Sequence, residues 1–218
     1  MIRFSKILIV LILGTVMIFN FISCRDKDID FWKWFSKNQI GLYHYEKDQQ
    51  ILFDELTKRL KSIDSNLVFE FSPVHADSIR EFTISADGLK ESFPTVIKLV
   101  EKAPKIPKWK INAFRQRVPG DGIQIVYDDS VKISYNDIYF RYAENAGKVD
   151  LELNIKNYKK ESGFDNAVFI LLDALIGEYD METRISGIDR KLLDESKLDS
   201  LHRIVELRDI VDNLKKKN

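Results

Sequence analysis

Histidines are the first side chains to consider for acid/base or metal chemistry, and the chain has His44, His75 and His202. His75 shares a predicted loop with Asp77, which would suit an acid/base pair or the beginning of a metal site. A metal site needs further ligands, and the sequence signals none near this pair. We interpret His75 and Asp77 as a solvated loop pair, and the sequence predicts no catalytic residue, no metal ligand and no cofactor.

Two short motifs lack residues that their chemistry requires. Ser162 has no glycine two positions before it, as a nucleophile elbow would need. Gly147-Lys148 is not a phosphate loop, because Tyr142 stands at the first glycine position and Val149 replaces Ser or Thr.

Carboxylates are plentiful, but pairing them for hydrolysis requires distances that a sequence does not give. The candidates considered are Asp87, Asp128, Asp129, Glu178 and Asp180.

Cys24 is the only cysteine of the chain, and it ends a segment with the plan of a secretory signal peptide. Arg3 and Lys6 are followed by an uncharged run over 7–22 and by a small residue. The last four residues, Phe21-Ile22-Ser23-Cys24, resemble the lipobox of bacterial lipoproteins, with Phe at the usual Leu position. The resemblance implies cleavage before Cys24 and a lipid anchor (diacylglyceryl, with palmitate) on its thiol, and two acyl chains are enough for stable membrane attachment.

The alternative is an uncleaved membrane anchor, for which the run over 7–22 is short, since a spanning helix needs roughly 20 apolar residues. Cleavage would leave 218 − 23 = 195 residues, long enough for one domain with its own core. The mature chain would carry 32 basic and 34 acidic residues, a net charge of −2. Such a balance gives no overall attraction to nucleic acid.

Charges alternate directly after the predicted lipid site, which predicts a solvated tether over 24–30. Asp26, Asp28 and Asp30 resemble a surface-export signal of some bacterial lipoproteins. The prediction is a protein anchored to a membrane of the bacterial cell envelope, with the membrane, the leaflet and surface exposure left open.

A basic segment between Lys102 and Gly120 has six cations and no acidic residue. If its side chains share a face, they could bind phosphate, lipid headgroups or an acidic partner. The other interpretation is a solvated loop and strand edge, because lysines often protect such edges. The candidate contact residues are Lys108, Trp109, Lys110, Arg115 and Arg117.

Hydrophobic spacing predicts both helices and strands. Predicted helices cover 52–63, 93–100, 164–179 and a C-terminal segment bearing Leu201, Ile204, Leu207, Val211 and Leu214. Predicted strands cover 67–71, 80–86, 149–156 and 181–185. Phe31, Trp34 and Phe35 also lie at helical spacing, and we favour the core over the lipid headgroup region for them. The pattern predicts one α+β domain over 31–218, a mainly antiparallel sheet with helices packed mostly on one face.

Three strings resemble an uncharacterised family of bacterial proteins: Phe31-Trp32-Lys33-Trp34-Phe35, Arg80 to Gly88 and Trp109 to Arg117. The resemblance covers most of the mature chain. It implies no catalytic residue, because the family has no established activity. Many members lack a signal peptide, which implies that the anchor was added to an existing domain.

Together these observations predict a lipid-anchored binding or accessory domain without catalysis. Its partners would be the membrane, through the lipid on Cys24, and an envelope protein or anionic molecule. One alternative is a small hydrolase whose site is visible only in three dimensions. Another is an immunity or inhibitor protein.

Overall fold

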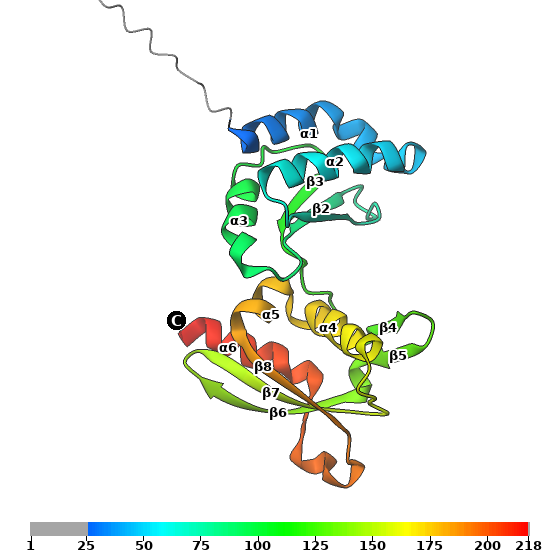
Figure 1. The fold of residues 1–218 in the computed structure, drawn as a ribbon, viewed down its shortest axis with the longest axis vertical. Helices are drawn as coiled ribbons and strands as arrows, with labels where there is room; N and C mark the ends of the chain where they lie inside the picture. Colours follow the sequence, from blue (N-terminus) through cyan, green and yellow to red (C-terminus); the bar gives the residue numbers. More distant parts are fainter. Residues whose placement is uncertain (1–25, 218) are drawn as a thin grey trace, which may run out of the picture.

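Three helices and a three-stranded sheet make up the N-terminal half of the protein (Figure 1). The computed structural model describes residues 26–217, so Cys24 and the predicted signal peptide lie outside the described residues. The elements of this half are α1 (Lys27–Tyr43), α2 (Gln49–Ile63), β1 (Val68–Phe71), β2 (Arg80–Ser85), α3 (Phe93–Glu101) and β3 (Trp109–Ala113). The strand order is β1-β2-β3, with β1 antiparallel and β3 parallel to β2.

The sheet of the N-terminal half has one apolar and one polar face. Phe82 and Ile84 of β2 are fully buried beneath α1 and α2. Phe31 and Phe35 of α1 stack on the Phe82 ring. The expected core position of Phe31 and Phe35 is therefore confirmed. The intervening residue Thr83 lies on the opposite face, as the period of two requires.

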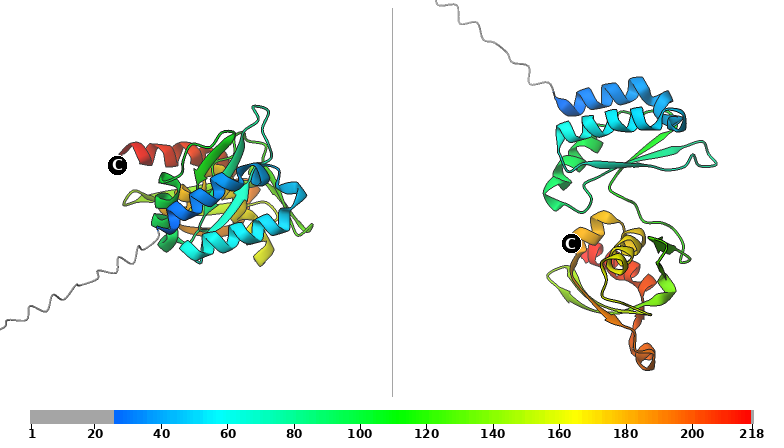
Figure 2. Two further views of the ribbon diagram at one scale, coloured as in Figure 1. Left: turned by 90° about the horizontal axis from the view of Figure 1, so that it is seen from above. Right: turned by 45° about the vertical axis from the view of Figure 1, so that its right-hand side comes forward.

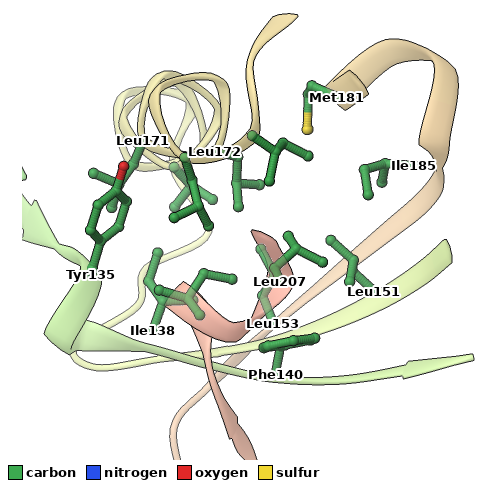
Figure 3. Packing of buried hydrophobic residues seen from close by; sticks show 14 of the residues in the cluster. Tyr135, Ile138, Phe140, Leu151, Leu153, Leu171, Leu172, Met181, Ile185 and Leu207 are labelled. Atoms are coloured by element: carbon green, nitrogen blue, oxygen red, sulfur yellow. The ribbon is translucent and has the colours of Figure 1, made fainter. Parts of the chain in front are cut away.

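The C-terminal half contains a two-stranded hairpin, a four-stranded sheet in the order β8-β7-β6-β9, and three helices. Its elements are β4 (Gln124–Tyr127), β5 (Val131–Ser134), β6 (Ile138–Asn145), β7 (Lys148–Ile155), α4 (Ser162–Ile176), α5 (Glu178–Arg184), β8 (Ile185–Leu192), β9 (His202–Arg203) and α6 (Leu207–Lys217). Figure 3 shows Leu172 of α4 pointing toward the sheet, with Leu171 beside Tyr135. The predicted alternation of β7 is confirmed, since Val149, Leu151, Leu153 and Ile155 are buried.

The predicted α+β class is confirmed, with a single domain and mainly antiparallel pairing. The sequence analysis expected one sheet, whereas the structure has three sheets and two hydrophobic clusters, one in each half. Among residues 26–217, none of the helices combines the length and apolarity needed to span a bilayer.

Several predicted boundaries were wrong. The predicted helix over 164–179 ends at Ile176, because Gly177 has a φ of 84°, and the separate helix α5 begins at Glu178. Residues 181–184 are helical, and the strand expected there begins at Ile185. The last helix begins at Leu207 rather than near Leu201. At the other end, α1 begins at Lys27, so the last four residues of the predicted tether belong to the fold.

Phe35→Ala is expected to lower the free energy of unfolding by about 3 to 5 kcal/mol, because it removes a buried ring from a packed core. Ile40→Ala, on the exposed side of the same helix, should change that free energy by less than about 0.5 kcal/mol. Urea titrations followed by tryptophan fluorescence measure both. Equal effects would contradict the placement of Phe35.

Candidate functional site

A cleft of about 1030 Å³ lies between the polar face of the three-stranded sheet and helix α4. The sheet contributes Glu70 and Thr83, and the turn after β2 contributes Asp87. On the opposite side, α4 contributes Phe169 and Ile170. Figure 2 shows the sheet and α4 facing each other. We call the segment between β3 and β4, residues 114–123, the linker, because it connects the two halves of the protein. The cleft is the best candidate for a binding site in the part of the chain that the structure describes.

Apolar side chains form one wall of the cleft. Phe169 and Ile170 are 41% and 44% exposed, although α4 buries its opposite face in the core. Val118 of the linker is also exposed beside them. Exposed apolar groups gathered in a concave surface are typical of a ligand site.

The buried carboxylate of Glu178 lies at the floor of the cleft and joins the two halves. Its side chain is 1% exposed. One oxygen accepts hydrogen bonds from the Ser85 hydroxyl at 2.8 Å and from the Gly88 amide at 3.1 Å. The other accepts from the Arg115 amide at 3.1 Å, while the Glu178 amide donates to the Arg115 carbonyl. Each carboxylate oxygen therefore binds groups of the N-terminal half or of the linker.

Two glycines allow this approach. Gly88 has a φ of 79°, which turns its amide toward Glu178 after the strand β2. Gly177 has a φ of 84°, and a Cβ there would lie 3.4 Å from the Arg115 carbonyl oxygen. A side chain at position 177 would therefore be strained by its backbone conformation, with its Cβ in van der Waals contact with the linker.

An aromatic contact accompanies the polar one. The rings of Phe93 and Phe114 lie 4.4 Å apart, and Tyr179 of α5 packs on Phe114 at 5.3 Å. Phe114 has a φ of 65°, an uncommon conformation for a large residue, and its amide donates to the Ile84 carbonyl. The chain is thus held in a turn where it enters the linker.

Arg115 is the central cation of the cleft. Its guanidinium donates to Glu70 and Asp87 and lies 3.8 Å from Asp173 and 3.9 Å from Glu178. Burial alone would lower the pKa of Arg115, but the hydrogen bonds to Glu70 and Asp87 raise it well above its usual range. The guanidinium is therefore matched by carboxylates from both sides of the cleft.

Asp173 has the most perturbed carboxyl group of the cleft. Burial, together with the negative charges of Glu178, Glu182 and Asp87, raises its pKa to about 6, although the charge of Arg115 opposes the shift. A carboxyl group with this pKa can donate or accept a proton near neutral pH.

The predicted contact residues do not all reach one site. Trp109 is buried among aromatic rings of the core, and Lys108 lies over the ring of Tyr43. Lys110 pairs with Glu81 at 2.9 Å. Arg115 and Arg117 line the cleft, but both bind carboxylates of the protein. Whether Lys108 and Lys110 contact an anionic partner stays a prediction.

Arg117 donates a hydrogen bond to a carbonyl group at the C-terminal end of α4. Its Nε donates to the Ile176 carbonyl at 2.9 Å, and its guanidinium pairs with Asp180 and Asp212. The Val118 amide donates to the Ala174 carbonyl in the same turn. Because the last carbonyls of a helix have no partner within the helix, these contacts stabilise its C-terminus against the linker.

His75 and Asp77 lie on an exposed loop, as predicted. Asp77 accepts a hydrogen bond from the Ile79 amide, and His75 Nε2 lies 3.7 Å from a Glu81 oxygen at the edge of the cleft. The other two motifs lie in regular structural positions. Ser162 begins α4, and Gly147 lies in the turn between β6 and β7. Within the described range 26–217, no group of three or more His, Cys, Asp or Glu residues is arranged to hold a metal ion.

The sequence analysis missed Asp173 and gave Glu178 no role. A signal for the helix end before Glu178 was present, since glycine at position 177 is a typical residue just after a helix. The environment of Asp173 could not be predicted, because its burial and the charges of Arg115 and Asp87 depend on the tertiary structure, although Glu178 and Glu182 are near in sequence.

Comparison of the chain with protein-family models, with curated proteins and with solved structures found no match in any of the three. The function proposed below is therefore based on the geometry of the cleft and on the predicted anchor.

Glu178→Ala is expected to lower the free energy of unfolding by about 3 kcal/mol, because Ser85, Gly88 and Arg115 would lose a buried acceptor. Glu182→Ala on the same helix is the matched control, since that side chain is partly exposed and pairs only with Lys90 among the contacts shown by residues 26–217. Its effect should stay below about 1 kcal/mol. Similar losses in both variants, measured by urea titration, would argue against a special role for Glu178.

Asp173→Asn is expected to stabilise the protein at neutral pH and to have little effect in acid. A raised folded-state pKa means that the folded protein binds the proton more tightly, so the stability contributed by this group falls as pH rises from about 4 to about 6. Removing the charge should therefore add up to about 3 kcal/mol above that window. Thermal unfolding from about pH 4 to pH 8 measures this, with Asp199→Asn on the surface as control. A variant less stable at neutral pH would contradict the assignment.

Proposed function

We propose that the protein is a lipid-anchored binding protein of the bacterial cell envelope, and that the cleft holds its ligand. The observation that carries this proposal is the cleft itself, in which an exposed apolar wall faces a polar sheet. The predicted acylation of Cys24 supplies the attachment to the membrane.

Binding suits the cleft better than catalysis. Glu70 and Asp87 are both paired with Arg115, and Glu81 is held by Lys110 and Asn112. A hydrolytic site needs a nucleophile or a water-activating base that is oriented by a further group. At the edge of the cleft, the side-chain partner that the structure of residues 26–217 shows for His75 is Glu81, at 3.7 Å from Nε2.

The charge of the cleft indicates the chemistry of the ligand. Six carboxylates and two guanidinium groups line it, so acidic groups are in excess. The six carboxylates are those of Glu70, Glu81, Asp87, Asp173, Glu178 and Glu182. A ligand with an apolar part for Phe169 and Ile170 and a cationic part near Asp173 would satisfy both surfaces.

A specific observation favours one alternative, hydrolysis, since Asp173 has a pKa of about 6 inside the cleft. Asp173 would then act as a general acid. If the protein is a hydrolase, the Asp173→Asn variant should retain uncleaved ligand in the cleft. If it is a binding protein, the same molecule should be recovered with Asp173 or with Asn at position 173. An immunity or inhibitor role stays a prediction.

Site-specific photo-crosslinking tests the binding site. A benzophenone amino acid at Phe169 is expected to give a discrete crosslinked product in intact cells, because that side chain faces the cleft. The same amino acid at Val126, which is exposed on β4, is the matched control. Ile170→Asp should remove the product by disrupting the apolar wall. Equal crosslinking at both positions would contradict the proposal.

The anchor has its own test. Mass spectrometry of the mature N-terminus is expected to show residue 24 as the first residue, with a diacylglyceryl group on the Cys24 sulfur. Recovery of the native chain with Met1 intact and a free thiol would overturn the membrane placement.

A further inference from the structure

Helix α1 has an outer face that no other element covers in the structure of residues 26–217. Ile29, Lys33, Lys37 and Ile40 follow one another at helical spacing and are exposed. The opposite side of the helix carries the buried Phe31 and Phe35. We call the four exposed residues the α1 stripe.

The α1 stripe has the composition of a membrane-contacting surface. Ile40 is 75% exposed, and Ile51 of the adjacent helix α2 is 73% exposed, the two highest values among large apolar residues of the described chain. Lys33 and Lys37 have no ion pair within residues 26–217, and the stripe contains no acidic residue. Isoleucine and lysine on one side of a helix suit the boundary between acyl chains and anionic headgroups.

Asp26 and Asp28, the two acidic residues nearest the predicted lipid, pair with lysines of the fold. Lys102 of the loop after α3 pairs with Asp26 at 2.6 Å and with Asp28 at 2.8 Å, and Lys98 lies 3.2 Å from Asp28. Hydrogen bonding to Lys102 lowers the pKa of Asp26. These carboxylates therefore add little repulsion from an anionic membrane.

The position of the lipid places this face close to the bilayer. Only Arg25 and Asp26 separate Cys24 from the first residue of α1. An extended chain spans about 3.5 Å per residue, so α1 begins within roughly 10 Å of the acylated sulfur. Figure 1 shows α1 at the end of the long axis, with the C-terminal half at the other end.

We infer that the α1 stripe lies on the membrane surface, so that α1 runs along the bilayer and the cleft faces away from it. The inference rests on the proposed acylation of Cys24. The sheet lies between the helix layer and the cleft, which directs the cleft to ligands in the aqueous compartment rather than to lipids. The bilayer is therefore the partner that we propose for the α1 stripe.

A fluorescent reporter on the full acylated chain tests this orientation. Because the sulfur of Cys24 would be acylated, Ile40→Cys introduces the single free thiol for an environment-sensitive dye. The protein is placed in vesicles of phosphatidylethanolamine and phosphatidylglycerol at about 3:1, with spin-labelled lipid as quencher. Quenching at Ile40→Cys is expected to exceed that at Leu192→Cys, an exposed control in the C-terminal half, by about twofold or more.

Charge reversal supplies the second measurement. Lys33→Glu with Lys37→Glu should reduce quenching at position 40, while Lys159→Glu with Lys160→Glu, in an exposed loop of the C-terminal half, should not. If mass spectrometry finds no lipid on Cys24, the anchor and this inference both fail. If the chain is acylated but positions 40 and 192 are quenched equally, the orientation is wrong and the proposed binding function stands.

Discussion

The hydrogen bonds to the buried Glu178 carboxylate are the contact on which the arrangement of the two halves depends. Each half has its own hydrophobic cluster, and the apolar contact between the halves described above is the packing of Tyr179 on Phe93 and Phe114. Glu178 binds Ser85 and Gly88 from one half and the Arg115 amide of the linker, and each donor would be unpaired without it. Because these bonds are directional, they define the cleft as well as closing its floor.

The arrangement separates two surfaces at opposite sides of the N-terminal sheet. Its apolar face is covered by α1 and α2, whose outer side we propose for the membrane. Its polar face forms the cleft with α4. A period of two along β2 therefore separates the proposed membrane side from the proposed ligand side, since Phe82 faces the helices and Thr83 faces the cleft.

Local patterns predicted the elements well and their assembly poorly. The alternation in β7 and the apolar spacing of α2 were sufficient to predict these two elements. Burial of one face imposes a period of two on a strand and of 3.6 on a helix. The break at Gly177 was missed because the apolar pattern continues through it, and only its positive φ ends the helix. The cleft was not predictable, since Asp87, Arg115 and Asp173 meet through tertiary structure. Lipidation of Cys24 was predicted from the position of this residue in the sequence, and it stays a prediction because the structure describes residues 26–217.

Native-state hydrogen exchange at the Gly88 and Arg115 amides tests most directly whether Glu178 holds the two halves together. Both amides donate to this carboxylate, so the account predicts that they exchange only through global unfolding, with protection similar to that of the buried Ile84 amide. Exchange as rapid as that of the exposed turn residue Asp128 would contradict it, because the joint would then open while both hydrophobic clusters remain folded.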